Sequence, residues 1–546
     1  MKRIKRDKKI KPPKVWNRRA VLVFAVICVA FAGLTVRLAR IMTGTLAQTA
    51  AEQNTGRIIL GQTRGYIYDR NGKPLVNTGR AQAAVVLCCA ETLDTVRTLL
   101  AGEDGMKDVK PGSVVTRVTD TDVPEGPCAK NVRLVTRSGE GLCRHVLGYV
   151  DGDGKGVCGL EAAFDKVLSD AAGTVCAEVT LDANGRALAG DGITLRSDNY
   201  DSPAGLVLTV DSIIQRIAEE ALARSSITCG AAVVQDCNTG ELLACASVPV
   251  YDPANLTPSL TDEDLPFLNR AVSAYPVGSV FKPFIAAAAL NAGRNLNDVY
   301  DCRGSMLVGT REFRCFNGNV HRGETLNEAI ANSCNCYFIE QGLAVGAEGV
   351  INTCAAFGFG RACELFPGDG SQKGNLPESE AITSDAQLAN LCFGQGELLI
   401  SPVQMAAAYS ALANGGTYYE PYLLKELIDG SGQTYGWFRP ETEPYRVADE
   451  AACRQIGKCL YNNMISGTGA GGRPANTTAA GKTATAQTGR YDETGTEQLC
   501  TWFAGYFPYT QPQYTVVVFN EKGRSAAVDC APVFKEIAEG IMDLRK

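Results

Sequence analysis

One long apolar segment lies near the start of the chain. Ala20 to Val36 is 17 residues without a charge, and a mostly apolar stretch continues to residue 42. As a helix, residues 20–36 would be about 25 Å long, close to the hydrocarbon thickness of a bilayer. Ten Lys and Arg residues and a single acid lie in residues 1–19, and the positive-inside rule places such a basic arm in the cytoplasm. We predict a cytoplasmic arm over residues 1–19 and a transmembrane anchor over residues 20–42, with the rest of the chain outside the cell membrane.

A cleaved signal peptide is the alternative interpretation of this segment. The apolar core of a signal peptide is usually shorter than this one. Arg37 and Arg40 also precede the Ala-rich stretch where cleavage would occur. The pattern therefore favours an uncleaved, single-pass anchor.

The pattern after the anchor changes near residue 200. Residues 43–60 are rich in Ala, Gln and Thr, which predicts a helical stalk. Arg64–Gly72 alternates like a strand and ends in an Asn-Gly turn. Residues 80–200 mix short apolar runs with Gly/Asp-rich turns. We predict a β-rich pedestal module over residues 43–200.

Denser apolar periodicity follows over residues 201–546. Asp211 ends a strand and is placed to cap a helix over Ser212–Arg224, and Phe284–Ala292 is an all-apolar helix that must be central. Pro532 is expected to open a final helix. Strands are predicted at both ends of this region: Gly205–Asp211, Gly230–Gln235, Glu241–Ser247, Thr501–Phe507 and Tyr514–Asn520. Strands at both ends with helices between them predict an α+β domain with an antiparallel sheet.

Composition and charge exclude several classes of function. The chain has 546 residues, of which 45% are hydrophobic and 21% charged, so most of it folds around a core. It has only two histidines, His145 and His321, which argues against a Ser-His-Asp hydrolase and a His-rich metal centre. The net charge is −6 and the basic residues concentrate in the arm, so we expect no nucleic-acid binding.

The 21 cysteines leave two interpretations open. No CxxC pair is present, so zinc-ribbon and thioredoxin signatures are missing. Cys302 and Cys315 are a plausible local disulfide in an oxidising exterior. The alternative is a set of buried thiols that act as small hydrophobic side chains. His321 and Cys334 are interpreted as structural or incidental.

A candidate nucleophile precedes the all-apolar helix. Ser279 and Lys282 are three residues apart, so they share one face of a helix, and Ser279 is the only serine with Lys at that spacing. A serine hydroxyl needs a base to become nucleophilic, and a lysine whose pKa is lowered by burial can serve as that base. The helix N-terminus would supply N–H groups for developing negative charge.

Two later motifs fit the same chemistry. Ser333 and Asn335 offer a proton relay and a substrate-binding amide. Lys482 belongs to the only Lys-Thr pair in the chain, and Thr483 and Thr485 follow it on a predicted strand. A second Ser-x-Asn, Ser197–Asn199, lies before the nucleophile among turn residues, and we interpret it as a loop.

The order Ser-x-x-Lys, Ser-x-Asn, Lys-Thr-x on an exported domain resembles the penicillin-recognising serine transpeptidases. The flanking segments resemble the class B penicillin-binding proteins, the monofunctional peptidoglycan D,D-transpeptidases of division, elongation and sporulation. The resemblance covers nearly the whole chain and includes Arg64–Gly72, Gly159–Glu161, Leu208–Gln215, Asn269–Ala271, Gly394–Gly396, Ser401–Pro402, Ala413–Gly416 and Trp502–Gly505. It implies a penicillin-binding-protein/serine β-lactamase-like domain on a pedestal with one transmembrane helix.

The resemblance also implies the roles of these residues. Ser279 would be acylated by the penultimate D-Ala of a pentapeptide stem, Lys282 would be its base, and Ser333 would pass a proton to the leaving amine. The substrate-binding roles would fall to Asn335 on the peptide backbone and to Lys482, Thr483 and Thr485 on the terminal carboxylate. The oxyanion hole would be formed by the N–H groups of Ser279 and Thr485.

One departure from the family pattern and several rival functions remain. Ala484 stands where the family usually has Gly. A methyl group at this position would crowd the strand against the nucleophile helix and so alter the geometry of acylation. Rival functions are a catalytically impaired scaffold that supports a membrane glycosyltransferase, a β-lactam sensor or β-lactamase, and a D,D-carboxypeptidase. A bifunctional polymerase is disfavoured because residues 44–200 are too few to form a glycosyltransferase domain. We expect peptidoglycan stems and β-lactams as ligands, a polytopic membrane glycosyltransferase as partner, and no cofactor or metal.

Overall fold

The computed structural model describes residues 14–43, 54–100, 109–440, 442–491 and 494–545, and the side chains from residue 18 onward. The chain forms two compact units, and the second unit is assembled from three separate segments. The first unit comprises the chain up to Gln62, Arg80–Leu134 and Thr174–Asp198. The second comprises Thr63–Gly79, Val135–Gly173 and Asn199–Lys546. That a pedestal over residues 43–200 and a domain over residues 201–546 fold as separate units stays a prediction.

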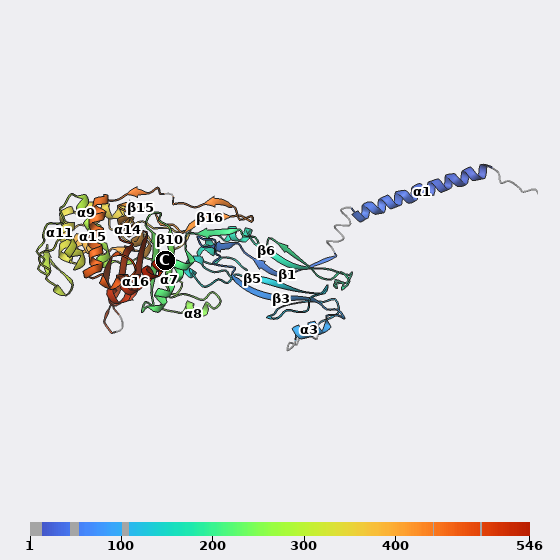
Figure 1. Ribbon diagram of the computed structural model, residues 1–546, viewed down its shortest axis with the longest axis horizontal. Coiled ribbons are helices and arrows are strands. Elements are labelled where there is room, and N and C mark those ends of the chain that lie inside the picture. Colours follow the sequence, from blue (N-terminus) through green and yellow to red (C-terminus); the bar gives the residue numbers. More distant parts are fainter. Residues whose placement is uncertain (1–13, 44–53, 101–108, 441, 492–493, 546) are drawn as a thin grey trace, which may run out of the picture. The chain divides into compact units, whose positions relative to one another are not determined.

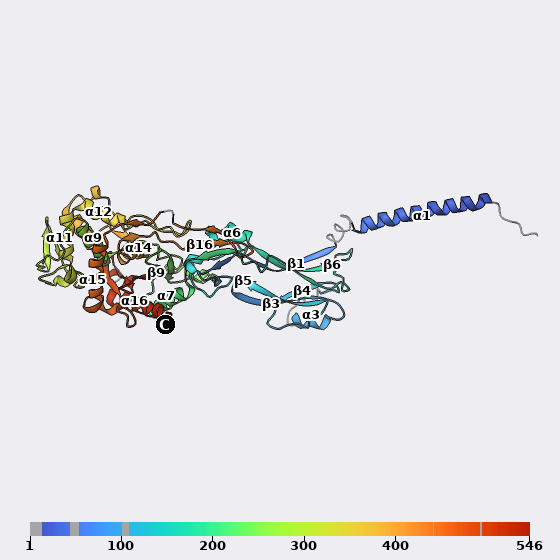
Figure 2. The same cartoon turned by 45° about the horizontal axis from the view of Figure 1, so that its top comes forward.

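The first unit contains a long apolar helix and two small sheets. Helix α1 (Lys14–Thr43) includes Arg18–Thr43, a stretch long and apolar enough to cross a membrane by length and composition. The sheets have the strand orders β1-β6-β7 and β4-β3-β5, and Val96 of α3 packs in one apolar cluster with Ala84 and Val86 of β3 (Figure 2). The bounds are β1 Thr55–Thr63, β3 Gly79–Leu87, α3 Leu93–Leu99, β4 Val114–Val118, β5 Ala129–Thr136, β6 Gly173–Thr180 and β7 Thr194–Asp198.

Two predictions about this region need correction. The stalk predicted over residues 43–60 is not a helix where it is described, because Thr55–Thr63 is strand β1 and pairs with β6. Most of the remaining stalk, and most of the predicted cytoplasmic arm, lies outside the described residues. Ser197 and Asp198 belong to strand β7 rather than to a loop, because they pair with Val175 and Thr174 of β6.

The second unit is built on a five-stranded antiparallel sheet of order β10-β9-β21-β20-β19. Alternate side chains of its strands enter two separate cores. Val233 and Phe519 belong to the core that contains α9 and α14, whereas Val234 and Val518 belong to the core that contains α7 and α16. The sheet is therefore covered on both faces by helices, and α9, α11 and α12 gather beside it (Figures 1 and 2). The strand bounds are β9 Gly230–Asp236, β10 Leu242–Val248, β19 Ala480–Tyr491, β20 Glu497–Phe507 and β21 Tyr514–Gly523.

Helices of one to several turns and short strands complete this unit. The helices are α4 Arg144–Leu147, α5 Gly159–Ala163, α6 Asp165–Asp170, α7 Ser212–Arg224, α8 Thr257–Leu260, η2 Gly278–Phe281, α9 Lys282–Asn291, η3 Phe316–Gly318, α10 Leu326–Ala331, α11 Asn335–Val345, α12 Ala347–Ala356, η4 Ser379–Ala381, α13 Asp385–Cys392, α14 Pro402–Ala413, α15 Glu450–Ser466, η5 Ala470–Gly472 and α16 Ala526–Asp543. The remaining strands are β2 Tyr66–Tyr68, β8 Gly205–Leu208, β11 Tyr275–Pro276, β12 Ser305–Val308, β13 Arg311–Arg314, β14 Leu399–Ile400, β15 Thr417–Tyr418, β16 Leu424–Ile428, β17 Thr434–Trp437 and β18 Tyr445–Arg446.

The sequence predicted several of the main elements of this unit. Asp211 caps α7 as expected, since its carboxylate accepts hydrogen bonds from the N–H groups of Ile213 at 2.9 Å and Ile214 at 3.2 Å. The all-apolar helix is α9, and its residues 284–289 are buried. The predicted start of the last helix is wrong, because α16 begins at Ala526 and Pro532 lies inside it. The carboxylate of Asp529 accepts hydrogen bonds from the N–H groups of Arg524 and Ser525 and so holds the first turn in place ahead of the proline.

The segment Arg64–Gly72 enters the second unit as an edge strand. Its β2 portion pairs in parallel with β8, in a sheet of order β17-β16-β8-β2. Arg64 is buried and donates a hydrogen bond to the buried carboxylate of Glu161 at 2.9 Å. Removing one partner of a buried ion pair of this kind lowers the stability of the protein by several kcal/mol, because the other charge is left buried and unpaired. Arg64–Gly72 is therefore structural in this unit.

Candidate active site

The candidate nucleophile lies in a tight turn at the entrance of α9. Ser279 is the second residue of the 3-10 turn η2, which leads directly into α9, and it is partly exposed. The preceding Gly278 has φ +69°, and its N–H donates to the carbonyl of Gly394 at 2.8 Å. On the other side of Ser279, the hydroxyl of Tyr409 from α14 donates to the carbonyl of Val280 at 2.9 Å. The turn that presents Ser279 is thus fixed by distant parts of the chain.

Lys282 is fully buried and joins the first two motifs directly. Its ammonium donates to the backbone carbonyl of Ser333 at 2.6 Å, to the Ser333 hydroxyl at 3.1 Å and to Asn335 Oδ1 at 2.7 Å. Burial lowers the pKa of Lys282 to about 8. A substantial fraction of the amine is therefore unprotonated at mildly alkaline pH, as a base requires. Among the described residues, the Lys282 side chain makes no hydrogen bond to Ser279.

The Ser333–Asn335 turn has an unusual backbone. Ser333 has φ +55°, a left-handed conformation that costs a non-glycine residue about 1 kcal/mol or more. Cys334 then caps α11, which begins at Asn335. The Asn335 amide donates to the carbonyl of Arg314 at 2.9 Å while its oxygen accepts from Lys282. Asn335 is thereby held from both ends.

The third motif lies on strand β19. Lys482 is fully buried, and its ammonium donates to the hydroxyl of Thr468 and to the carbonyl of Thr483, both at 3.1 Å. Burial first, and then the positive charge of Lys282, lower the pKa of Lys482 well below its usual value. The two cations are thus close enough to repel each other. An anionic group of a substrate would relieve that repulsion.

Strand β19 runs beside the nucleophile turn. A methyl group built on Gly278 would lie 3.2 Å from the Thr485 carbonyl oxygen and 3.4 Å from the methyl of Ala484. The Trp502 indole of the neighbouring strand β20 donates to the carbonyl of Pro276, just before the turn, at 2.8 Å. Ala484 is buried opposite Trp502, whereas the side chain of Thr485 is exposed. The structure thus brings all three motifs to one place.

Two residues behind the third motif were not predicted from the sequence. Asn463 of α15 is fully buried; its amide donates to the carbonyl of Gly481 at 2.8 Å and its oxygen accepts from the Thr468 hydroxyl at 3.2 Å. Thr468 in turn accepts from Lys482. No sequence pattern indicates these contacts, because they connect a helix and a loop to the strand only through the tertiary fold.

The cysteines are thiols throughout the described residues. Of the two interpretations left open by the sequence, the structure has the buried thiols: Cys302 and Cys315 are not bonded, since their sulfurs are 3.7 Å apart. Instead, three cysteines and one histidine meet beside the Ser333–Asn335 turn, with ligand atoms all within 4.8 Å of one another: Cys302, Cys315, His321 and Cys334. These residues could hold a metal ion. Of the two roles considered for His321 and Cys334, structural or incidental, this arrangement favours the structural one.

Comparisons with known proteins agree with this geometry. The family model described as the penicillin binding protein transpeptidase domain matches residues 230–539. Stage V sporulation protein D of Bacillus subtilis (strain 168) is 29% identical, over 92% of this chain and 81% of that protein. Peptidoglycan D,D-transpeptidase MrdA of Salmonella typhimurium (strain SL1344) is 26% identical, over 97% and 96%. Among solved structures, penicillin binding protein 3 from Mycobacterium tuberculosis complexed with aztreonam matches with a TM-score of 0.64 and 24% identity, over 90% of this chain and 97% of that one.

Proposed function

Because this chain belongs to the penicillin-binding protein transpeptidase family, we propose that it is a peptidoglycan D,D-transpeptidase that works through a serine acyl-enzyme. Its substrates are the pentapeptide stems of peptidoglycan, and β-lactams acylate the same serine. One observation carries the assignment of residues. The buried ammonium of Lys282 is hydrogen-bonded to both Ser333 and Asn335, which makes one site from two motifs that are about 50 residues apart.

Acylation begins with the serine hydroxyl. Unprotonated Lys282 takes the proton of Ser279 as its Oγ attacks the carbonyl carbon of the penultimate D-Ala. Backbone N–H groups of Ser279 and Thr485 stabilise the oxyanion of the tetrahedral intermediate. The proton then passes through the Ser333 hydroxyl to the leaving amine, and the terminal D-Ala departs. The hydrogen bond from Lys282 to Ser333 supports this route.

The acyl-enzyme is resolved by the amino group of a second stem. That amine attacks the ester carbonyl, loses a proton to the same relay, and leaves a cross-link and free Ser279. Lys482 provides the positive charge for the terminal carboxylate of the donor stem, together with Thr483 and Thr485. Asn335 holds the donor peptide backbone. Burial and the charge of Lys282 lower the pKa of Lys482, so an anionic ligand would favour the charged form of Lys482.

Intact-mass analysis with a fluorescent penicillin tests this assignment. We expect one penicilloyl adduct on the wild type and none on Ser279→Ala, with Ser431→Ala as a surface control that labels normally. Labelling of Ser279→Ala at the wild-type rate would refute the nucleophile assignment. Lys282→Ala should also stop acylation while the protein stays folded.

An impaired scaffold is the second candidate function. Ala484 is the observation in its favour, because its methyl lies against the nucleophile turn. Incubation with a pentapeptide donor and an amino-acid acceptor separates the possibilities. Cross-linked product supports the transpeptidase, release of D-Ala by hydrolysis alone supports a carboxypeptidase, and penicillin binding without turnover of the peptide supports a scaffold or sensor.

We also propose that α1 anchors the protein in the cell membrane with its N-terminus in the cytoplasm. The apolar length of Arg18–Thr43 and the basic residues before it support this orientation. With no polymerase predicted in the chain, the pedestal is expected to contact a polytopic membrane glycosyltransferase. Co-purification of the full-length protein in mild detergent tests this, and repeated isolation without such a partner would count against it.

A further inference from the structure

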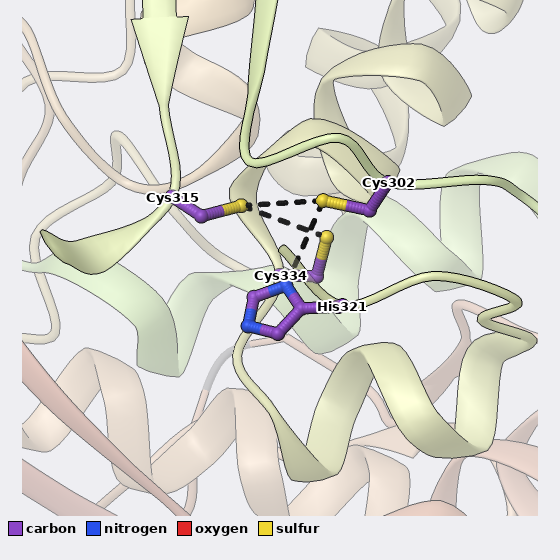
Figure 3. A group of neighbouring side chains, drawn as sticks. All are labelled: Cys302, Cys315, His321 and Cys334. Atoms are coloured by element: carbon purple, nitrogen blue, oxygen red, sulfur yellow. Dashed lines mark hydrogen bonds between the residues drawn. The ribbon is translucent and has the colours of Figure 1, made fainter. Parts of the chain in front are cut away.

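Four side chains from separate loops point their ligand atoms at one another beside the candidate active site (Figure 3). Cys302 precedes β12 and Cys315 follows β13, so pairing of these two strands brings their sulfurs together. His321 comes from the following loop, and Cys334 caps α11. The three cysteines are buried and the histidine is largely covered.

Three of the six distances between these ligand atoms match a tetrahedral metal site, and all six lie within 4.8 Å. The sulfur of Cys302 lies 3.7 Å from that of Cys315 and 3.7 Å from His321 Nδ1, and the sulfurs of Cys315 and Cys334 are 3.8 Å apart. Four ligands around Zn²⁺, with Zn–S near 2.3 Å and Zn–N near 2.05 Å, have edges of about 3.8 Å between sulfurs and about 3.6 Å between sulfur and nitrogen. A disulfide would need the sulfurs about 2.05 Å apart.

Other polar groups lie around the cluster and point toward it. The backbone N–H of Gly304 donates to the sulfur of Cys302 and that of Tyr337 to the sulfur of Cys334, each at 3.4 Å. Outer hydrogen bonds of this kind orient the side chains that bind a metal ion. The carboxylate of Glu324, buried and with Oε2 unpartnered among the described residues, lies 3.9 Å from His321 Nδ1.

We propose that Cys302, Cys315, His321 and Cys334 bind one Zn²⁺. Three thiolates and one imidazole in a tetrahedron suit Zn²⁺ better than Mg²⁺ or Ca²⁺, which require oxygen ligands. Binding releases three protons, one from each thiol, while neutral His321 donates the lone pair of Nδ1 and keeps its proton on Nε2. All four positions of the tetrahedron come from the protein, so the ion is structural rather than catalytic.

The site also explains how the Ser333–Asn335 turn is held. Cys334 lies between Ser333, whose φ is +55°, and Asn335. Cys315 follows Arg314, whose carbonyl accepts the Asn335 amide. The ion therefore ties together both backbone segments that position Asn335, and with it the hydrogen bonds to Lys282. Loss of Zn²⁺ should disturb the second motif without removing any group that touches the substrate.

Metal content tests the binding directly. Wild type purified under reducing conditions should hold about one zinc per chain, and Co²⁺ in its place should give the intense absorption of a tetrahedral thiolate complex. Cys302→Ser and Cys334→Ser should fall below about a tenth of an equivalent, because a lost thiolate weakens the site strongly. Cys336→Ser is the matched control: its sulfur lies 3.6 Å from that of Cys315, yet Cys336 is not one of the four ligands, so zinc should be retained.

The effect on the active site is tested on wild-type protein, so that misfolding of a variant does not decide the outcome. Removal of zinc with a chelator should lower the rate of penicillin acylation at least about tenfold, and adding Zn²⁺ back should restore it. Three results would each overturn the site. The first is less than about a tenth of an equivalent of zinc in wild type supplied with Zn²⁺, and the second is full retention of zinc by Cys302→Ser. The third is a wild-type mass 2 Da lower than that of the reduced chain, which would mark a Cys302–Cys315 disulfide. An acylation rate unchanged by zinc removal would overturn its link to the Ser333–Asn335 turn. Failure of Ser279 to acylate at all would instead refute the proposed function and leave the metal result standing.

Discussion

At the scale of single residues, the ionisation of Lys282 makes a prediction about pH. Its pKa of about 8 means that the amine is mostly protonated at neutral pH. The rate of acylation should therefore rise about tenfold per pH unit below pH 8 and level off above it, so that pH 6 lies about a hundredfold below the plateau. Second-order acylation constants from pH 6 to pH 9.5, with thermal midpoints as the control for folding, measure this. A flat profile would remove Lys282 from the role of base.

Asn463 is a second residue whose function follows from its contacts. Asn463→Ala leaves the carbonyl of Gly481 and the hydroxyl of Thr468 short of a partner in a buried place, which costs about 1–3 kcal/mol of stability. Because Thr468 positions Lys482, we also expect weaker acylation by penicillin. The neighbouring Asn462→Ala is the control, since Asn462 bonds to Asn327 rather than toward β19. Equal acylation constants for the two variants would contradict the positioning role.

The sequence indicates the proposed reactive groups more readily than the groups that position them. Ser279, Lys282 and Lys482 were predictable because their side chains are chemically distinctive and their spacing is short. Asn463 and the four proposed zinc ligands were not, because each belongs to a different loop or helix and only the tertiary fold brings them together. The ligand spacing Cys302-x12-Cys315-x5-His321-x12-Cys334 contains no local pair that would have indicated a metal site.

At the scale of elements, the loop Gly394–Gly396 supports the nucleophile turn. A methyl on Gly394 would lie 2.0 Å from the carbonyl oxygen of Gly278, whereas a methyl on Gly396 would only touch Asn390 at 3.4 Å. Both glycines have positive φ, so replacing either one by alanine destabilises the backbone by a similar amount, about 1 kcal/mol. Gly394→Ala should therefore lose most penicillin acylation and Gly396→Ala should keep it. Similar acylation by the two folded variants would show that the loop does not hold the turn.

Strand β19 makes a prediction through Ala484. Its methyl lies beside Gly278, so Ala484→Gly should leave the acylation rate unchanged or raise it. Displacing one oxyanion-hole donor costs about 10²–10³ in rate, so any gain from moving the N–H of Thr485 closer to the oxyanion would be easy to detect. Ala486→Gly is the matched control, because Ala486 faces Gly278 from the same strand and also loses one methyl. A large loss of rate in Ala484→Gly alone would show that this methyl makes a needed contact.

Local patterns predicted elements well wherever apolar periodicity and capping agreed. Helix α7 begins where Asp211 caps it, and β9, β10, β20 and β21 follow the predicted apolar runs. The failures have specific causes. The helical stalk predicted over residues 43–60 is instead strand β1 from Thr55 onward, because β6 pairs with it. Pro532 suggested a helix start, yet the carboxylate of Asp529 holds an earlier first turn.

At the scale of the whole chain, the order of segments does not match the order of compact units. A change in composition near residue 200 suggested two consecutive domains. The second unit, however, also includes Thr63–Gly79 and Val135–Gly173. No local pattern reports that a strand 140 residues earlier completes a sheet, because parallel pairing of β2 with β8 depends on the tertiary fold.

This organisation predicts how the chain tolerates truncation. A protein that starts at residue 201 lacks β2 and apolar side chains buried in the core of the second unit, among them Ile67, Val146 and Leu160. Each contributes about 1.5–3 kcal/mol, and a typical domain is stable by only 5–15 kcal/mol. We expect that protein to be insoluble or unfolded. A protein that starts at residue 54 lacks only α1 and the residues around it, so it should fold and acylate penicillin like the full chain. Thermal unfolding and penicillin labelling of the two proteins decide this, and normal labelling by the shorter one would show that residues 201–546 fold without the earlier segments.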